Sequence, residues 1–165
     1  AEAGAEVTGI DLSPVAIDVA REHCSQSGLN IDYRVSDITG LKDKGEFDVI
    51  LCSEVLEHVD DLNEFLREAL LKLKSGGIFL FSTINNTLKA KFLTIFMAED
   101  ILRLLPQGTH SGDRFIKPSD LVSILSDNDV EVEEVKGMKL NPIKLNFSIT
   151  KDTSVNYIGY GVKRS

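Results

Sequence analysis

Short apolar runs alternate with segments of helical periodicity along most of the chain. The apolar runs predict strands at 5–10, 31–35, 47–52 and 78–83. Such alternation is typical of βαβ units, in which helices connect the strands of a mostly parallel sheet. Two later runs, 130–137 and 156–162, alternate apolar and polar residues, and we expect them to form an antiparallel edge. The sequence therefore predicts an α/β fold.

Apolar residues at helical spacing predict helices at 14–27, 61–74, 88–105 and 118–126. Ser13 and Pro14 suit the N-cap and the first helical position, and Gly28 suits a helix end. The segment Ser75-Gly76-Gly77 is expected to end the second helix. With 165 residues, the chain is long enough for one domain, expected to span 1–165, with a sizeable core.

Composition and charge narrow the range of partners. Apolar residues make up 42% of the chain and charged residues 27%, which are ordinary globular values. The net charge of −8 argues against a nucleic-acid partner, because phosphate binding needs a basic surface. Cys24 and Cys52 have no metal-type spacing, and we expect reduced thiols in a reducing compartment. No stretch is long and apolar enough to span a bilayer, so we expect a soluble intracellular protein.

The strongest chemical signal comes directly after the predicted strand at 47–52. Glu54, Glu57 and His58 are spaced i, i+3 and i+4, so they share one face if the segment turns helical there. Open α/β sheets keep their ligand crevices at the carboxyl ends of the strands. Two carboxylates and an imidazole at such a crevice can hold a divalent cation or supply an acid and a base. The alternative interpretation is a polar first turn of a solvated helix.

Two aspartates lie at other predicted strand ends. Asp11 closes the first strand, where a carboxylate in a nucleotide-binding fold accepts hydrogen bonds from the two ribose hydroxyls. Asp11 can also form an Asx turn or N-cap before the helix that starts at Pro14. Asp37 follows the second strand and is placed to meet an exocyclic amine, and a plain turn residue is an equally good interpretation.

Several longer stretches follow these strand ends in a fixed order. They are LKSGG at 73–77, FSTIN at 81–85, AEDIL at 98–102, LPQGTH at 105–110, FIKP at 115–118, GMKLNP at 137–142 and VNY at 155–157. Together with the strand ends, they resemble the class I methyltransferases that use S-adenosylmethionine and, more narrowly, the family of ubiquinone-biosynthesis O-methyltransferases. The resemblance covers nearly the whole chain. It implies a Rossmann-like class I methyltransferase sheet with an antiparallel C-terminal edge.

The resemblance also implies that this sheet is incomplete. The family begins with a strand and a glycine-rich turn that wraps the methionine part of the cofactor, and this sequence contains no G-x-G-x-G cluster. The absent first strand lies centrally in the fold. We therefore expect the strands ending at Asp11 and Asp37 to pair only with each other, and the strands ending at Cys52 and Thr83 to pair with each other and with the antiparallel edge. The chain is expected to be the C-terminal two-thirds of such an enzyme.

The implied reaction transfers a methyl group from S-adenosylmethionine to a phenolic or catechol hydroxyl of a polyprenylated ubiquinone precursor. The implied cofactor-binding residues are Asp11, Asp37, Ile38 and Ser53. Two alternatives stay open: another small-molecule S-adenosylmethionine-dependent methyltransferase, or an inactive truncated remnant. The missing glycine-rich turn favours the remnant for this chain alone, whereas the intact cluster of Glu54, Glu57 and His58 opposes it.

The resemblance further implies that Glu54, Glu57 and His58 hold a cation, with magnesium the expected metal. Such a cation would lower the pKa of the acceptor hydroxyl and orient it. Glu57 and His58 are the candidate catalytic residues. In a metal-free alternative, His58 acts as a general base oriented by a carboxylate. His110 is a further candidate near the substrate, although a turn histidine fits it nearly as well.

The apolar segment 88–105 has two interpretations. It either packs against the sheet or lies at a bilayer surface, where its basic residues Lys89, Lys91 and Arg103 meet anionic headgroups. A polyprenyl substrate has to be drawn from a membrane, so peripheral membrane contact is one expectation. Other ubiquinone-biosynthesis proteins are expected partners. The expected location is the cytoplasm, with membrane association, or the matrix face of the mitochondrial inner membrane in a eukaryote.

Overall fold

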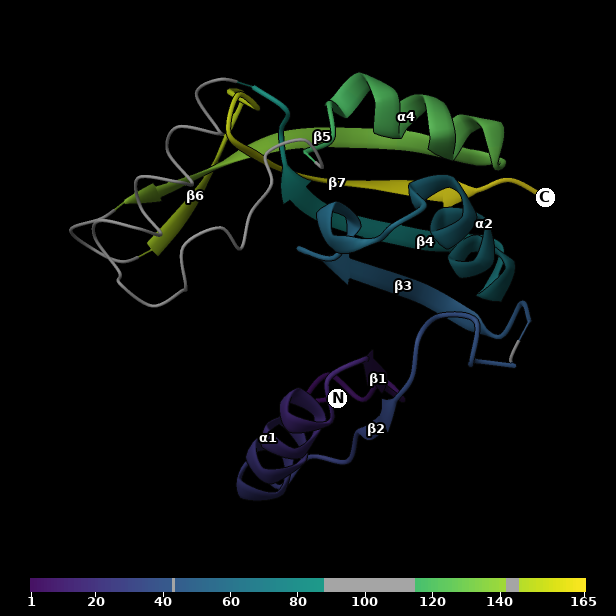
Figure 1. Cartoon of the computed structure of the whole chain (residues 1–165), viewed down its shortest axis with the longest axis vertical. Coiled ribbons are helices and arrows are strands. Elements are labelled where there is room, and N and C mark those ends of the chain that lie inside the picture. Colours follow the sequence, from purple (N-terminus) through teal and green to yellow (C-terminus); the bar gives the residue numbers. More distant parts are fainter. Residues whose placement is uncertain (43, 88–114, 142–145) are drawn as a thin grey trace. The chain divides into compact units, whose positions relative to one another are not determined.

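The computed structural model describes residues 1–42, 44–87, 115–141 and 146–165 (Figure 1). The chain divides into two compact units, Ala1–Asp43 and Lys44–Ser165, and each is described by itself. The predicted helix at 88–105 and His110 lie outside the described residues. The prediction of one domain over the whole chain stays a prediction.

The first unit is a single βαβ element. Strands β1 (Thr8–Asp11) and β2 (Asp32–Val35) pair in parallel, and helix α1 (Pro14–Gln26) connects them. Ser13 caps the helix as predicted, because its Oγ accepts a hydrogen bond from the backbone N–H of Ala16 at 3.2 Å. Gly28 follows the helix with φ +65°, a left-handed conformation that glycine adopts without strain.

The second unit contains a five-stranded mixed sheet with the order β3-β4-β7-β5-β6. Its strands are β3 (Phe47–Ser53), β4 (Leu73–Ile84), β5 (Val130–Asn141), β6 (Asn146–Thr150) and β7 (Asn156–Lys163). β3 and β4 are parallel, whereas β7 is antiparallel to both β4 and β5. The described strands thus form two sheets with the pairing that the sequence predicts. Strand β6, which the sequence analysis did not predict, pairs with β5 at the end of the sheet.

Two helices pack against this sheet and against each other. Helix α2 (Leu62–Lys72) lies on β4, and helix α4 (Pro118–Asp127) lies along β5, as Figure 1 shows. Their apolar faces form the core with the sheet: the most buried side chains are Leu66, Leu70, Leu73, Phe79, Phe81, Leu121, Leu125 and Tyr157. No helix in the described part of the chain is long and apolar enough to cross a bilayer.

The predicted end of the second helix, at Ser75-Gly76-Gly77, is wrong. Helix α2 stops at Lys72, and β4 begins at once with the fully buried Leu73. No glycine cap is needed there, because other groups bond the last helical carbonyls. Lys163 Nζ donates to the Leu70 and Leu73 carbonyls at 2.7 and 3.0 Å, and the Gly45 backbone N–H donates to the Leu71 carbonyl.

Cys24 and Cys52 are both free and buried. Burial raises the pKa of the Cys52 thiol to about 12. Cys52 is therefore a neutral core thiol near neutral pH.

Candidate functional site

The carboxyl ends of the parallel strands β3 and β4 lie side by side, because Ser53 stands opposite Ser82 in the register. The chain turns sharply at the next residue. Glu54 has φ +52°, and its backbone N–H donates to the Ser82 carbonyl at 3.0 Å. A short 3₁₀ helix, η1 (Leu56–His58), follows. The expectation that Glu54, Glu57 and His58 share a face of one helix is therefore wrong, because the left-handed Glu54 lies outside η1.

The turn nevertheless brings two of these side chains together. The carboxyl groups of Glu54 and Glu57 lie close enough for each to affect the other, because Glu57 raises the pKa of Glu54. Thr83 Oγ1 donates to Glu57 Oε2 at 2.6 Å, and Ser82 Oγ donates to Glu54 Oε1 at 3.1 Å. Ser53 Oγ lies 3.1 Å from Ser82 Oγ and extends this network. We call Glu54 and Glu57 the carboxyl pair.

The electrostatics of the carboxyl pair favour a proton on Glu54. Burial of the Glu54 carboxyl, the negative charge of Glu57 and the hydrogen bond to Glu57 raise the pKa of Glu54 to about 7, although the hydrogen bond from Ser82 opposes the change. Glu54 as a whole residue is exposed, whereas Glu57 is only 4% exposed. The Glu54 carboxyl therefore holds its proton more tightly than an ordinary glutamate does, and it can give or take one near neutral pH.

His58 and Tyr157 lie near Glu57: His58 follows it in η1, and the charge of Glu57 acts on the Tyr157 phenol. His58 is exposed at the end of η1. Tyr157 is fully buried on β7, and its hydroxyl donates to the Ile116 carbonyl at 3.1 Å. Burial and the charges of Glu57 and Asp120 raise the pKa of the Tyr157 phenol, so it stays neutral.

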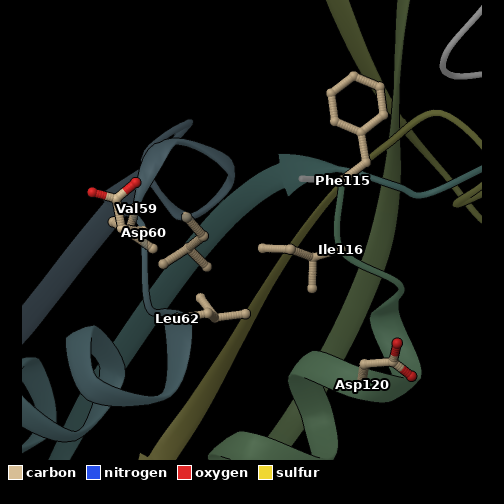
Figure 2. Close-up of a pocket in the computed structure, with 7 residues that line it drawn as sticks. Val59, Asp60, Leu62, Phe115, Ile116 and Asp120 are labelled. Atoms are coloured by element: carbon tan, nitrogen blue, oxygen red, sulfur yellow. The ribbon is translucent and has the colours of Figure 1, made fainter. Parts of the chain in front are cut away.

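A cavity of about 340 Å³ opens next to η1 (Figure 2). Its lining residues are Leu56, Val59, Asp60, Leu62, Phe115, Ile116 and Asp120. In Figure 2, Leu62 and Ile116 point toward one another, while the carboxylates of Asp60 and Asp120 lie at the outer sides. Apolar and acidic side chains share the lining, and a cavity of this size can take a small ligand. One of the lining residues, Leu56, belongs to the same short helix as Glu57.

The candidate cofactor residues of the first unit take part in local turns. Asp11 Oδ1 accepts a hydrogen bond from the Ser13 backbone N–H at 2.7 Å, which is the expected Asx turn. Asp37 Oδ1 accepts from Thr39 Oγ1 and from the Gly40 N–H, both at 2.8 Å. These hydrogen bonds, first that of Thr39, lower the pKa of Asp37. The roles of Asp11, Asp37, Ile38 and Ser53 in cofactor binding stay predictions.

The carboxylates of Glu54 and Glu57 are oxygen ligands of the kind that magnesium binds. Magnesium commonly takes one or two carboxylates and completes its shell with water or substrate oxygens, so Glu54 and Glu57 are suitable ligands. The described residues contain no group of three or more His, Cys, Asp or Glu side chains that could hold a metal ion. The three-residue site with His58 therefore stays a prediction.

The chain is similar in sequence to known methyltransferases. A family described as "Methyltransferase domain" matches residues 1–81. The ubiquinone biosynthesis O-methyltransferase of Pelagibacter ubique is 44% identical over 160 residues, covering 97% of this chain and 67% of that protein. The protein of the same name from Actinobacillus pleuropneumoniae serotype 7 is 43% identical over 164 residues, covering 96% of this chain and 70% of its own length.

Solved structures agree with the fold. A SAM-dependent methyltransferase from Methanosarcina mazei has a TM-score of 0.70 at 19% identity, covering 96% of this chain and 82% of that one. The magnesium protoporphyrin IX methyltransferase from Synechocystis has a TM-score of 0.69 at 19% identity. The match covers 99% of this chain and 68% of that one. Together with the 43% and 44% identical relatives, these likenesses lead to one conclusion. The chain belongs to the ubiquinone biosynthesis O-methyltransferase family of S-adenosylmethionine-dependent enzymes.

Proposed function

We propose that the enzyme methylates a phenolic or catechol hydroxyl of a polyprenylated ubiquinone precursor, and that the carboxyl pair removes the hydroxyl proton. The observation that carries this proposal is the carboxyl pair of Glu54 and Glu57 at the carboxyl end of β3, with the pKa of Glu54 raised to about 7. The family membership supports the methyl transfer, and the names of the relatives support the substrate class.

The chemistry explains why a base is needed. The acceptor oxygen attacks the methyl carbon of the sulfonium, the carbon–sulfur bond breaks, and S-adenosylhomocysteine leaves. The acceptor hydroxyl must lose its proton, and a catechol hydroxyl is only a weak acid near neutral pH. A carboxyl with a pKa near 7 is a far better proton acceptor than an ordinary glutamate, because general bases work best when their pKa lies near the working pH.

The neighbouring cavity is the proposed site for the apolar part of the acceptor. Its walls include Leu56, Leu62 and Ile116, and it adjoins the turn that carries Glu57. An aromatic ring held there would present a hydroxyl toward the carboxyl pair.

Magnesium is the proposed metal in an alternative to direct proton removal: Glu54 and Glu57 would then hold it as ionised carboxylates, with His58 as the third candidate ligand. When bound, it would supply positive charge that lowers the pKa of the acceptor hydroxyl. On the cofactor side, Asp11 is proposed to bind the ribose hydroxyls, Asp37 and Ile38 the adenine, and Ser53 the methionine end. These assignments rest on their positions at the ends of β1, β2 and β3.

We also propose peripheral membrane contact through 88–105, on the sequence argument that its apolar residues are flanked by lysine and arginine. A polyprenylated acceptor and other ubiquinone-biosynthesis proteins remain the proposed partners. The location in the cytoplasm or at the mitochondrial inner membrane remains a prediction.

The direct test is a methyl-transfer assay on the full-length protein with methyl-labelled S-adenosylmethionine and a short-chain catechol. We expect a labelled aryl methyl ether, and no product from the same ring with both hydroxyls already methylated. If magnesium takes part, a chelator abolishes product formation and added magnesium restores it; full activity in chelator would favour the carboxyl pair or His58 as a metal-free base. A protein that binds no S-adenosylmethionine in calorimetry would be the inactive remnant.

A further inference from the structure

We propose that Thr83 and Ser82, at the carboxyl end of β4, are positioning residues that hold Glu57 and Glu54 in contact. The inference rests on the proposed function, because it assumes that the carboxyl pair handles the acceptor proton. It concerns hydroxyl groups that sequence reasoning did not single out as site residues.

Thr83 is bonded to the more buried member of the pair. Its side chain is fully buried, Glu57 is 4% exposed, and the donor and acceptor oxygens lie 2.6 Å apart. This distance is typical of a hydroxyl that donates to an ionised carboxylate, which is among the stronger hydrogen bonds in proteins. A buried carboxylate needs such a donor, since an unpaired charge in the core is costly.

Ser82 has the same relation to the other carboxyl. It is 4% exposed, and its Oγ donates to Glu54 Oε1 at 3.1 Å while Ser53 Oγ lies 3.1 Å from the same hydroxyl. Ser82 and Thr83 are neighbours at the carboxyl end of β4, and each bonds a different glutamate.

The two hydroxyls limit how the carboxyls can rotate. Thr83 engages Oε2 of Glu57, and Ser82 engages Oε1 of Glu54. With one oxygen of each carboxyl held, the carboxyl pair keeps one orientation before substrate arrives. Such preorganisation contributes to turnover, because a displaced carboxyl loses its alignment with the acceptor hydroxyl.

The test compares Thr83→Val, which keeps the shape but lacks the hydroxyl, with Thr83→Ser, which keeps the hydroxyl. Thr150→Val is the matched control, because it removes a threonine hydroxyl from β6 of the same sheet. In the full-length protein, we expect Thr83→Val to lower kcat about 10- to 100-fold, the loss expected for a hydrogen bond to a charged group. Thr83→Ser should restore most of the turnover, and Thr150→Val should leave it unchanged. The KM for S-adenosylmethionine should stay the same in all three.

A double-mutant cycle with Glu57→Gln separates positioning from a general structural effect. If Thr83 acts through Glu57, Thr83→Val should change kcat by less than about 2-fold once Glu57 is already Gln. An equal loss in both backgrounds, or a Thr83→Ser variant as slow as Thr83→Val, would overturn the inference. If Thr83→Val does not fold, Ser82→Ala in a cycle with Glu54→Gln gives the same comparison. If Glu57→Gln alone leaves turnover intact, the proposed function fails and the positioning role fails with it. If Glu57→Gln is slow but Thr83→Val costs the same in both backgrounds, the positioning role alone fails.

Discussion

Glu54 is the residue whose charge state responds most directly to pH near neutrality. Its pKa is raised from 4.5 to about 7, mainly by burial and then by the charge of Glu57. Between pH 4.5 and about 7, Glu54 is therefore protonated in the folded protein and ionised in the unfolded chain. Stability from this group is fully present below pH 4.5 and is lost as the pH rises through 7.

Glu54→Gln should remove this pH dependence, because glutamine does not titrate. In urea unfolding of the metal-free protein, the free energy of unfolding of the wild type relative to the variant should fall between pH 5 and pH 8. Wild-type and variant curves that stay parallel over this window would contradict the raised pKa of Glu54.

The residues of the site differ in how far the sequence predicts them. Glu54 and Glu57 follow a recognisable strand, and this position together with their spacing indicates a site. Thr83, Ser82 and Tyr157 gain their roles from strand register: Ser82 stands opposite Ser53, and Tyr157 opposite Thr83. Register between distant strands leaves no local pattern in the sequence, so these contacts could not be predicted from it.

The elements themselves follow the local patterns closely where one face is buried. Helix α1 and helix α4 begin at the predicted residues, since Pro14 and Pro118 stand at their first turns. The two misses have physical causes. Strand β6 carries exposed apolar residues, Phe147 at 64% and Ile149 at 62%, so no buried face marks it. The end of α2 depends on Lys163, which lies far along the sequence.

Strand β7 tests the packing of the sheet, because it lies between β4 and β5. A Cβ at Gly159 would lie 2.5 Å from Phe81 Cζ and 2.6 Å from the Glu134 carbonyl oxygen. Gly159→Ala should therefore lower the free energy of unfolding by about 1–3 kcal/mol, the usual cost of overpacking. Urea unfolding checks this, with Ser123→Ala on the exposed side of α4 as a control expected within about 0.5 kcal/mol of wild type. Equal stability of Gly159→Ala and wild type would contradict the packing described for β7.

At the scale of the whole molecule, the described strands form the two sheets that the family resemblance implies, with β1 and β2 in one and β3 through β7 in the other. The parallel pairs β1–β2 and β3–β4 are the ones expected within each sheet. The relatives identify an O-methyltransferase family. The turn after β3 carries the carboxyl pair, and the end of β4 carries the hydroxyls that bond it. The central claim is that this pair acts on the acceptor and leaves cofactor binding unaffected.

The most direct test of that claim is Glu57→Gln in the full-length protein, with kcat for a short-chain catechol measured beside the Kd for S-adenosylmethionine. We expect kcat to fall about 100-fold or more, because the variant loses a general base. The Kd for S-adenosylmethionine should stay within about 2-fold of the wild-type value. Unchanged turnover, or a loss of cofactor affinity that accounts for the whole loss of turnover, would contradict the claim.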